Sequence, residues 1–313
     1  MRVLCLHGRG TSAAIFKSQT ATFRAHLPKS YTFDFVDGPF PCAPYPGIDT
    51  IFRPARGHYF RAWWTEPTPE AIRAAHRWLD NYIARHGPYD SVMCFSQGCS
   101  LVASYLLYHA DERGPNVPPP FSSAVFICGG LPFEVLEDLG VEVSARAHEI
   151  SAQTSRLLRR RAGLLTEFAA GVGSRAAQLK MKLGMARSGT GPLAGPRRTS
   201  LWDDKSGLVH DADRRVLPDP SDCFGLDFGQ VPEHLRITIP TVHVYGARDP
   251  RCPASIQLSY FCREAGHTRM YDHGGGHDIP RSTVVSKRLA ELVRELHGGA
   301  DSGYASSEGT ASD

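Results

Sequence analysis

The chain has 313 residues, with 35 lysines and arginines against 32 aspartates and glutamates, for a formal net charge of +3. This mild excess argues against nucleic-acid binding, which depends on concentrated positive charge, and no run of about 18 apolar residues is present that would span a membrane. A chain of about 300 residues can bury a full core, and α/β folds of this length commonly form one domain.

The first predicted element is a buried strand at 2–7, which ends in a loop containing Gly8 and Gly10. A glycine-bracketed loop after a strand can direct backbone N–H groups at a developing oxyanion. We assign one such N–H to Arg9, with Gly10 as the nearest alternative. The loop can also be read as a plain turn or a phosphate loop, but the Lys-Ser/Thr pair that a P-loop requires does not follow.

Aromatic residues gather before the first long helix. A second strand is predicted at 31–36, and Phe60, Trp63 and Trp64 precede an amphipathic helix at 69–85 that has proline in its first turn. We interpret these three side chains as a substrate pocket suited to an acyl or polyketide chain. Core packing is the stronger alternative for at least one of the tryptophans.

The next strand, at 90–95, runs into Ser96 and a helix that begins at once. This strand–turn–helix arrangement lifts a serine hydroxyl above a sheet as a nucleophile, and the N–H of Gln97 would then be a second oxyanion donor. Cys94 stands where the G-x-S-x-G motif has its first glycine. A Ser-Gln-Gly turn before a helix is often only an N-terminal cap, so the partners of Ser96 decide its role.

A further strand at 123–128 is followed by an insertion at 140–222 that interrupts the alternation of strands and helices. Its first half, about 142–184, contains helical sequence rich in arginine and lysine. The stretch 188–222 is rich in Gly, Pro, Arg and Asp without sustained periodicity. The whole insertion can also be read as a solvated or partly disordered segment.

The last two strands, at 241–246 and 268–272, are each followed by a residue that could assist a serine nucleophile, an acid after the first and a histidine after the second. Asp249 comes after the first and His277 after the second, where three glycines let the backbone turn sharply. His273 flanks the same glycines and is the alternative base. The order serine, acid, histidine, each after a strand, is that of the α/β-hydrolase fold.

The predicted strands are separated by stretches long enough for crossover connections, including a second amphipathic helix at 280–296. This alternation predicts an α/β-hydrolase fold with a mostly parallel central sheet flanked by helices on both faces. We expect one serine hydrolase domain over 1–297 and a polar, disordered tail at 298–313.

Six segments together resemble the fungal serine hydrolase family, often called FSH-type hydrolases, over about 1–135 and 222–297. The resemblance implies similarity to hydrolases of fungal polyketide clusters, such as the thioesterase that releases lovastatin, and within this fold 140–184 is then a lid and 188–222 a loose loop. The segments that carry the resemblance are 4–8 (LCLHG), 37–39 (DGP), 63–64 (WW), 95–98 (FSQG), 244–250 (VYGARDP) and 276–280 (GHDIP).

These features predict hydrolysis of an ester or thioester by Ser96, His277 and Asp249, with release or trimming of a polyketide or acyl intermediate in fungal secondary metabolism. Alternatives are a general small-ester carboxylesterase and a catalytically silent scaffold that binds a ligand or partner. An acyl carrier protein is a possible partner, which the basic residues of the insertion, including Arg159, Arg160 and Arg161, would attract.

No cofactor and no metal are expected, since the proposed chemistry needs none and the eight cysteines lack metal-binding spacing. Cys94 and Cys99 are too far apart for a C-x-x-C pair, and Cys5 and Cys128 fall in apolar strand runs. They read as reduced core thiols, which favours a cytoplasmic location. Met1 leads directly into the first strand, so secretion is not expected.

Overall fold

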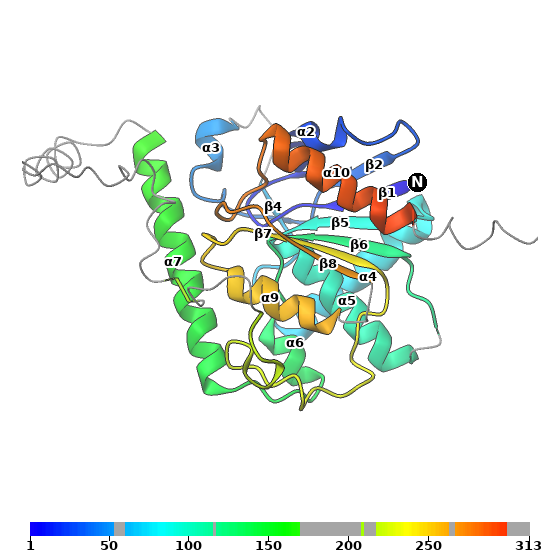
Figure 1. Ribbon diagram of the computed structural model, residues 1–313, viewed down its shortest axis with the longest axis vertical. Helices are drawn as coiled ribbons and strands as arrows, with labels where there is room; N and C mark the ends of the chain where they lie inside the picture. Colours follow the sequence, from blue (N-terminus) through cyan, green and yellow to red (C-terminus); the bar gives the residue numbers. More distant parts are fainter. Residues whose placement is uncertain (53–59, 115–116, 170–207, 210–216, 263–266, 299–313) are drawn as a thin grey trace, which may run out of the picture.

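The computed structural model describes residues 1–52, 60–114, 117–169, 208–209, 217–262 and 267–298. Its centre is a six-stranded sheet in the order β2-β1-β5-β6-β7-β8, in which every neighbouring pair is parallel (Figure 1). The strands are β1 (Arg2–Leu6), β2 (Thr32–Val36), β5 (Ser91–Phe95), β6 (Ser123–Ile127), β7 (Thr241–Tyr245) and β8 (Thr268–Asp272).

The four inner strands, β1, β5, β6 and β7, are buried on both faces because helices cover both, as Figure 1 shows, whereas the edge strands β2 and β8 are partly exposed. Alternate residues of β1 enter different cores: Leu4 and Leu6 join one cluster, and Val3 and Cys5 join the other. The first cluster is covered by α4 (Pro69–His86), α5 (Gln97–Arg113) and α9 (Cys252–Phe261), and the second by α1 (Ala13–Gln19), α2 (Ala21–Arg24) and α10 (Thr283–Gly298).

The predicted fold class is confirmed, and each strand begins and ends within one residue of its predicted boundary. The helix predicted at 69–85 is α4, where Thr68 caps the first turn by accepting from the Ala71 N–H. Several elements were not predicted. They are the antiparallel pair β3 (Phe40–Pro41) and β4 (Arg61–Ala62), the helices α1, α2, α3 (Ile48–Ile51), α6 (Phe133–Asp138) and α9, and the 3₁₀ turn η2 (Pro220–Asp222).

One long helix, α7 (Ala145–Ala169), forms the described part of the helical half of the insertion. In Figure 1 it lies to the left of the sheet, beside the ends of the strands. Most of the remaining insertion, 170–207 and 210–216, lies outside the described residues, and so does the tail from 299. Gly298 belongs to α10 rather than to the tail.

The charge on α7 is not all exposed. Arg161 is only 5% exposed and its guanidinium donates to the Arg248 carbonyl at 2.9 Å. The expectation that Arg161 belongs to a cationic surface is therefore wrong, because its position on the helix turns it toward the turn after β7. Arg160 is exposed.

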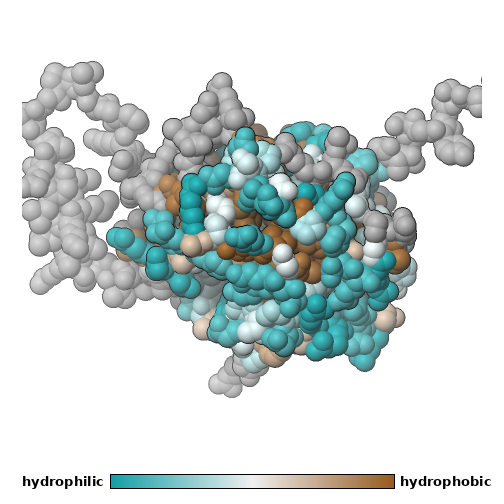
Figure 2. All heavy atoms as spheres, turned by 90° about the horizontal axis from the view of Figure 1, so that it is seen from below, coloured by the Kyte–Doolittle hydropathy of each residue, from teal (hydrophilic) through white to brown (hydrophobic). Residues whose placement is uncertain are grey.

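All eight cysteines are free thiols. Among the described helices, none has the length and apolar character needed to cross a bilayer. The face of the molecule in Figure 2 is mostly hydrophilic, with apolar residues gathered toward its middle. The large apolar side chains that are exposed in the described ranges come from separate segments: Phe40, Ile51, Val117, Leu217 and Val284.

His243, in the middle of β7, is a buried neutral histidine. Its ring stacks on Phe126 at 5.2 Å, and burial lowers its pKa to about 3. The unfolded chain binds a proton at this residue below about pH 6.5, whereas the folded chain does not until near pH 3. The stabilisation is thus fully present above pH 6.5 and is lost as the pH falls toward 3.

We therefore expect His243→Phe to make stability less sensitive to acid. One such group contributes a slope of about 1.4 kcal/mol per pH unit, so the free energy of unfolding should fall by about 2 kcal/mol less in the variant between pH 6.5 and 5. Urea unfolding at several pH values measures this. Parallel pH curves for the two proteins would contradict it.

Candidate active site

Ser96 occupies a strained turn between β5 and α5. Its φ of 51° is unusual for a residue with a side chain, and its N–H donates to the Ile127 carbonyl at 3.0 Å. Gly98 lets α5 begin this close to the sheet, since a Cβ there would lie 2.3 Å from the Leu6 carbonyl oxygen. The turn therefore presents the serine hydroxyl at the carboxyl edge of the sheet.

Cys94, at the position where the motif has glycine, fits without disturbing this turn. Its side chain is fully buried in the first core cluster, and its thiol lies 3.4 Å from the Val125 carbonyl oxygen. The close approach that demands glycine is made by Gly98 and not by residue 94. The departure from the motif thus leaves the geometry of Ser96 intact.

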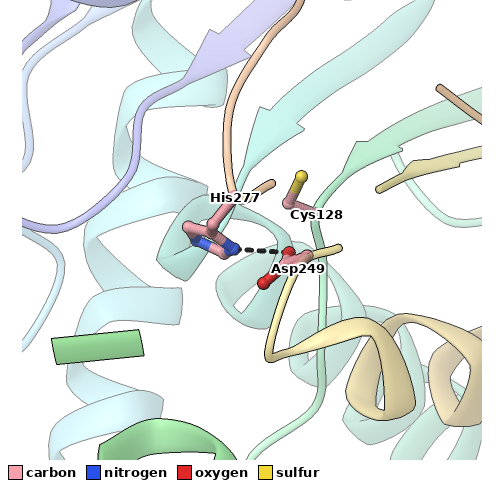
Figure 3. Close-up of side chains that lie close together, drawn as sticks. All are labelled: Cys128, Asp249 and His277. Carbon is pink, nitrogen blue, oxygen red and sulfur yellow. Dashed lines mark hydrogen bonds and ion pairs between the residues drawn. The ribbon is translucent and has the colours of Figure 1, made fainter. Parts of the chain in front are cut away.

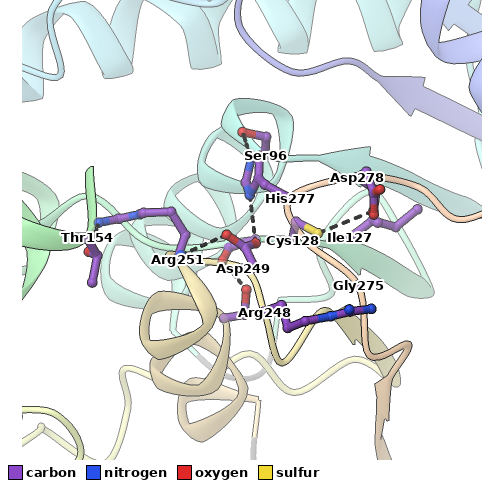
Figure 4. Close-up of polar contacts among 12 residues, drawn as sticks. Ser96, Ile127, Cys128, Thr154, Arg248, Asp249, Arg251, Gly275, His277 and Asp278 are labelled. Carbon is purple, nitrogen blue, oxygen red and sulfur yellow. Dashed lines mark hydrogen bonds and ion pairs between the residues drawn. The ribbon is translucent and has the colours of Figure 1, made fainter. Parts of the chain in front are cut away.

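Ser96, His277 and Asp249 form one chain of hydrogen bonds (Figure 4). His277 Nδ1 lies 2.7 Å from Asp249 Oδ2, and His277 Nε2 lies 3.0 Å from Ser96 Oγ. The Asp249 side chain is fully buried, and its other oxygen accepts the Arg251 N–H at 2.7 Å. A carboxylate accepts only, so Nδ1 carries the proton and Nε2 is left to receive one from the serine.

The structure does not bring His273, the alternative base, or Asp272, the acidic residue at the end of β8, to the serine. His273 Nδ1 accepts the Gly275 N–H at 3.2 Å within its own turn. Asp272 Oδ1 accepts the N–H groups of Ala247 and Gly274 at 2.8 and 2.7 Å, and so caps the turns that follow β7 and β8. Both residues hold the loops in shape.

Cys128 lies beside the acid and the histidine, so that three atoms of metal-ligating type are within 4.8 Å of one another (Figure 3). The chemistry does not favour a metal ion here. His277 Nδ1 is already engaged with Asp249, and burial, reinforced by the Asp249 and Asp278 charges, raises the pKa of the Cys128 thiol. A protonated thiol is a poor metal ligand.

The two backbone N–H groups assigned to an oxyanion hole, those of Arg9 and Gln97, belong to residues that line the same cleft as Ser96. Within the described chain, neither N–H has a hydrogen-bond acceptor. The Gly10 N–H, by contrast, donates to the Arg61 carbonyl at 2.9 Å, which removes Gly10 as the alternative. The Arg9 and Gln97 N–H groups therefore have no competing acceptor among the described residues, and their role as oxyanion donors stays a prediction.

A buried histidine fixes the loop that carries Arg9. His7 Nε2 accepts the Gly38 N–H at 3.0 Å, so its Nδ1 carries the proton and donates to the Gly8 carbonyl at 2.7 Å. Burial lowers the pKa of His7, which keeps the ring neutral in this arrangement. Its role is to support the loop rather than to take part in proton transfer.

Gln97 has a second task that its sequence context did not reveal. Its side-chain amide accepts the Trp63 N–H at 3.1 Å and donates to the Trp64 carbonyl at 3.0 Å. Gln97, itself a residue of the cleft, thus also fixes the segment that contributes Trp64 to the cleft wall. No local pattern signals such a long-range pair.

A cleft of about 820 Å³ opens over Ser96 and His277. Trp64 lines it, as predicted for the pocket, but the other two predicted residues do not. Trp63 is fully buried and its indole donates to the His7 carbonyl at 2.8 Å, while Phe60 is absent from the cleft walls. The lining includes Pro44, Tyr45, Pro46, Trp64, Leu131, Pro132, Phe133, Leu158, Arg159 and Arg251.

Tyr45 is a wall residue that sequence reasoning missed. Burial raises the pKa of its phenol, and the nearby Asp249 and Cys128 raise it further. The hydroxyl therefore stays protonated and able to donate to a ligand. Nothing in the sequence around Tyr45 indicates this position, because it depends on the Tyr45 N–H bonding to the Gly10 carbonyl at 2.9 Å.

The Arg251 side chain links α7 to the turn that contains Asp249. Its Nη1 group lies 3.0 Å from the Ser151 carbonyl oxygen, Thr154 Oγ1 and Ser155 Oγ, and Figure 4 shows Arg251 extending toward Thr154. One side of α7 is consequently a wall of the cleft. The position of Arg251, two residues after Asp249, was the only sequence signal for this contact.

A parallel sheet with a serine elbow after β5, a carboxylate after β7 and a histidine after β8 defines an α/β-hydrolase. The chain belongs to the Serine hydrolase (FSH1) family, whose match covers residues 1–158 and 161–289. It is accordingly a hydrolytic enzyme.

The chain is similar to several fungal proteins. It is 28% identical to Esterase FPY3 of Fusarium mangiferae (91% of this chain, 90% of that protein) and 30% identical to Esterase alnB of Emericella nidulans (90% and 91%). Hydrolase FUB4 of Gibberella moniliformis is 28% identical (94% and 98%). Among solved structures, Arabidopsis thaliana SOBER1 aligns at 15% identity with a TM-score of 0.42 (95% of this chain, 99% of that chain).

Proposed function

We propose that Ser96, His277 and Asp249 are the catalytic triad of this hydrolase and that its substrates are carboxylic esters and thioesters. The observation that carries the proposal is the continuous hydrogen-bond chain from a fully buried carboxylate to a serine hydroxyl that lines a large cleft. The N–H groups of Arg9 and Gln97, which have no acceptor among the described residues, supply the remaining part of an acyl-transfer site.

The reaction follows from these positions. His277 Nε2 takes the proton of Ser96 as its oxygen attacks the carbonyl carbon, and the Arg9 and Gln97 N–H groups donate to the resulting oxyanion. The imidazolium then returns the proton to the leaving alcohol or thiol, which departs and leaves an acyl-enzyme. Water, deprotonated by His277, repeats the attack and releases the acid and the free serine. Asp249 orients the imidazole throughout.

We further propose that the natural substrate is a polyketide or acyl thioester delivered by an acyl carrier protein. The resemblance to hydrolases of fungal polyketide clusters supports this, as does the apolar part of the cleft wall, which includes Trp64, Leu131 and Phe133. The alternative is a general carboxylesterase for small esters. The eight free thiols support a reducing, cytoplasmic location.

The test compares one acyl group in three forms: hexanoyl p-nitrophenyl ester, hexanoyl N-acetylcysteamine thioester and hexanoyl carrier protein. We expect all three to be hydrolysed, with kcat/KM at least about tenfold higher for the carrier-bound thioester than for the free one, because binding to the carrier adds to binding of the acyl chain. A higher value for the ester than for either thioester would favour the carboxylesterase. No hydrolysis and no labelling by a fluorophosphonate would indicate a silent scaffold.

A further inference from the structure

Arg251 places a guanidinium in the wall of the cleft, and no described carboxylate forms an ion pair with it. All four of its side-chain hydrogen bonds in the described structure are made by Nη1, to neutral oxygens of Ser151, Thr154 and Ser155. Its Nε and Nη2 groups, which carry three more hydrogens, have no acceptor among the described residues. Arg251 is half-buried, and a cation partly withdrawn from water in this way is costly unless an anion joins it.

A second guanidinium lies nearby on the same wall. Arg159 is exposed, lines the cleft from α7, one helical turn after Ser155, and makes no ion pair with any described residue. The two cations are close enough to influence each other: burial lowers the pKa of Arg251, the Asp249 carboxylate opposes this, and Arg159 lowers it further. Two like charges beside one cavity favour a ligand of opposite charge.

Apart from the buried Asp249, whose two oxygens are engaged by His277 Nδ1 and the Arg251 backbone N–H, the other charged residues of the cleft form no ion pair with Arg159 or Arg251 within the described structure. The Arg9 side chain donates to the Thr65 carbonyl, and His148 is paired with Glu137 at 2.9 Å. Glu66 and Glu134 are exposed residues of the wall, and neither forms an ion pair within the described part of the chain. Among the described residues, therefore, no carboxylate forms an ion pair with the guanidinium of either arginine.

We propose that Arg159 and Arg251 form an anion subsite beside the triad, which binds a carboxylate or phosphate carried by the substrate. This inference rests on the proposed function, because it assigns the subsite to a molecule whose ester or thioester bond reaches Ser96. The planar guanidinium suits both anions, since it can donate two parallel hydrogen bonds to either. A carboxylate would lie on the acyl chain, and a phosphate on the pantetheine arm of a thioester.

The first experiment measures selectivity with p-nitrophenyl esters of matched length, the monoester of glutaric acid and its neutral methyl ester. The wild-type enzyme should show a kcat/KM ratio in favour of the anion, chiefly through KM. Arg159→Gln should lower that ratio by about 10- to 100-fold, the range expected for a lost charge-assisted hydrogen bond, and Arg159→Lys should restore part of it. Arg160→Gln is the matched control, since Arg160 is exposed on the same helix outside the cleft.

The second experiment separates the two sources of the anion and uses no turnover. Glutarate and inorganic phosphate are titrated into the Ser96→Ala protein by calorimetry, with and without Arg159→Gln. Binding of glutarate alone assigns the subsite to the acyl chain, and binding of phosphate alone assigns it to the pantetheine arm. Loss of either binding in Arg159→Gln supports the proposal.

The proposal fails if wild-type enzyme hydrolyses the neutral ester at least as well as the anionic one and neither anion binds. It also fails if Arg159→Gln and Arg160→Gln change the selectivity ratio equally, because a general surface field would then be responsible. Hydrolysis of neither ester is a different result, which overturns the proposed function itself. Arg251→Gln provides a second variant, with thermal unfolding measured to detect any loosening of α7.

Discussion

Replacing Ser96 by alanine should abolish ester hydrolysis and covalent labelling by a fluorophosphonate while the protein stays folded. The Ser96 hydroxyl has one side-chain partner in the described structure, His277 Nε2 at 3.0 Å, and it lies in the cleft rather than in a core. Alanine keeps the Cβ that the strained backbone already accommodates. The free energy of unfolding should therefore change by about 1 kcal/mol or less.

Activity, labelling and urea unfolding are measured on the same preparations of wild type and Ser96→Ala. Ser100→Ala is a useful companion, because Ser100 also lines the cleft but its hydroxyl donates to the Gly130 carbonyl at 3.0 Å instead of to a histidine. It should remain labelled. Labelling that persists in Ser96→Ala would mean that another residue is the nucleophile.

The substitution Asp249→Asn should lower kcat by about 10⁴-fold, with His277→Ala comparably damaging. Asp249 Oδ2 accepts the His277 Nδ1 proton, and Oδ1 accepts the Arg251 N–H, so both oxygens are committed. An asparagine side chain has one oxygen and one NH₂ group. If its oxygen stays with Arg251, its NH₂ faces Nδ1 and forces the ring into the tautomer that cannot take the serine proton.

Asp272→Asn is the matched control for this prediction, since it makes the same chemical change at the end of β8, which lies three strands from β5 in the sheet. Asp272 Oδ1 accepts two backbone N–H groups, and the amide oxygen of asparagine can keep both. Steady-state kinetics should show a change of less than about tenfold. A severe loss in Asp272→Asn together with a tolerant Asp249→Asn would reverse the assignment of the acid.

The strands and the chain order of the three proposed triad residues could be predicted because each depends on local sequence. A buried strand of a parallel sheet is a short apolar run, and the carboxyl ends of such strands meet at one edge. Ser96, Asp249 and His277 each follow one of these runs, so their proximity follows from the topology.

The residues that were missed, or placed wrongly, depend on contacts between distant segments. Trp63 was expected in the pocket, but its indole reaches the His7 carbonyl, which no periodicity reveals. The positions of Arg161 and Arg251 depend on how α7 docks against the turn after β7. Arg161 was predicted to be on the surface from its charge alone. The sequence of one helix does not show which of its faces will pack against the rest of the protein.

The docking of α7 has a consequence for recombining this enzyme with its relatives. Arg251 reaches from the acid-bearing turn to three residues of α7, and Arg161 reaches back from α7 to the Arg248 carbonyl. These reciprocal contacts join residues that are about 90 positions apart in the chain into one structural block. A chimera that exchanges 145–161 should therefore exchange 246–252 with it, because a crossover between them separates the cleft wall from the aspartate turn to which it is fitted.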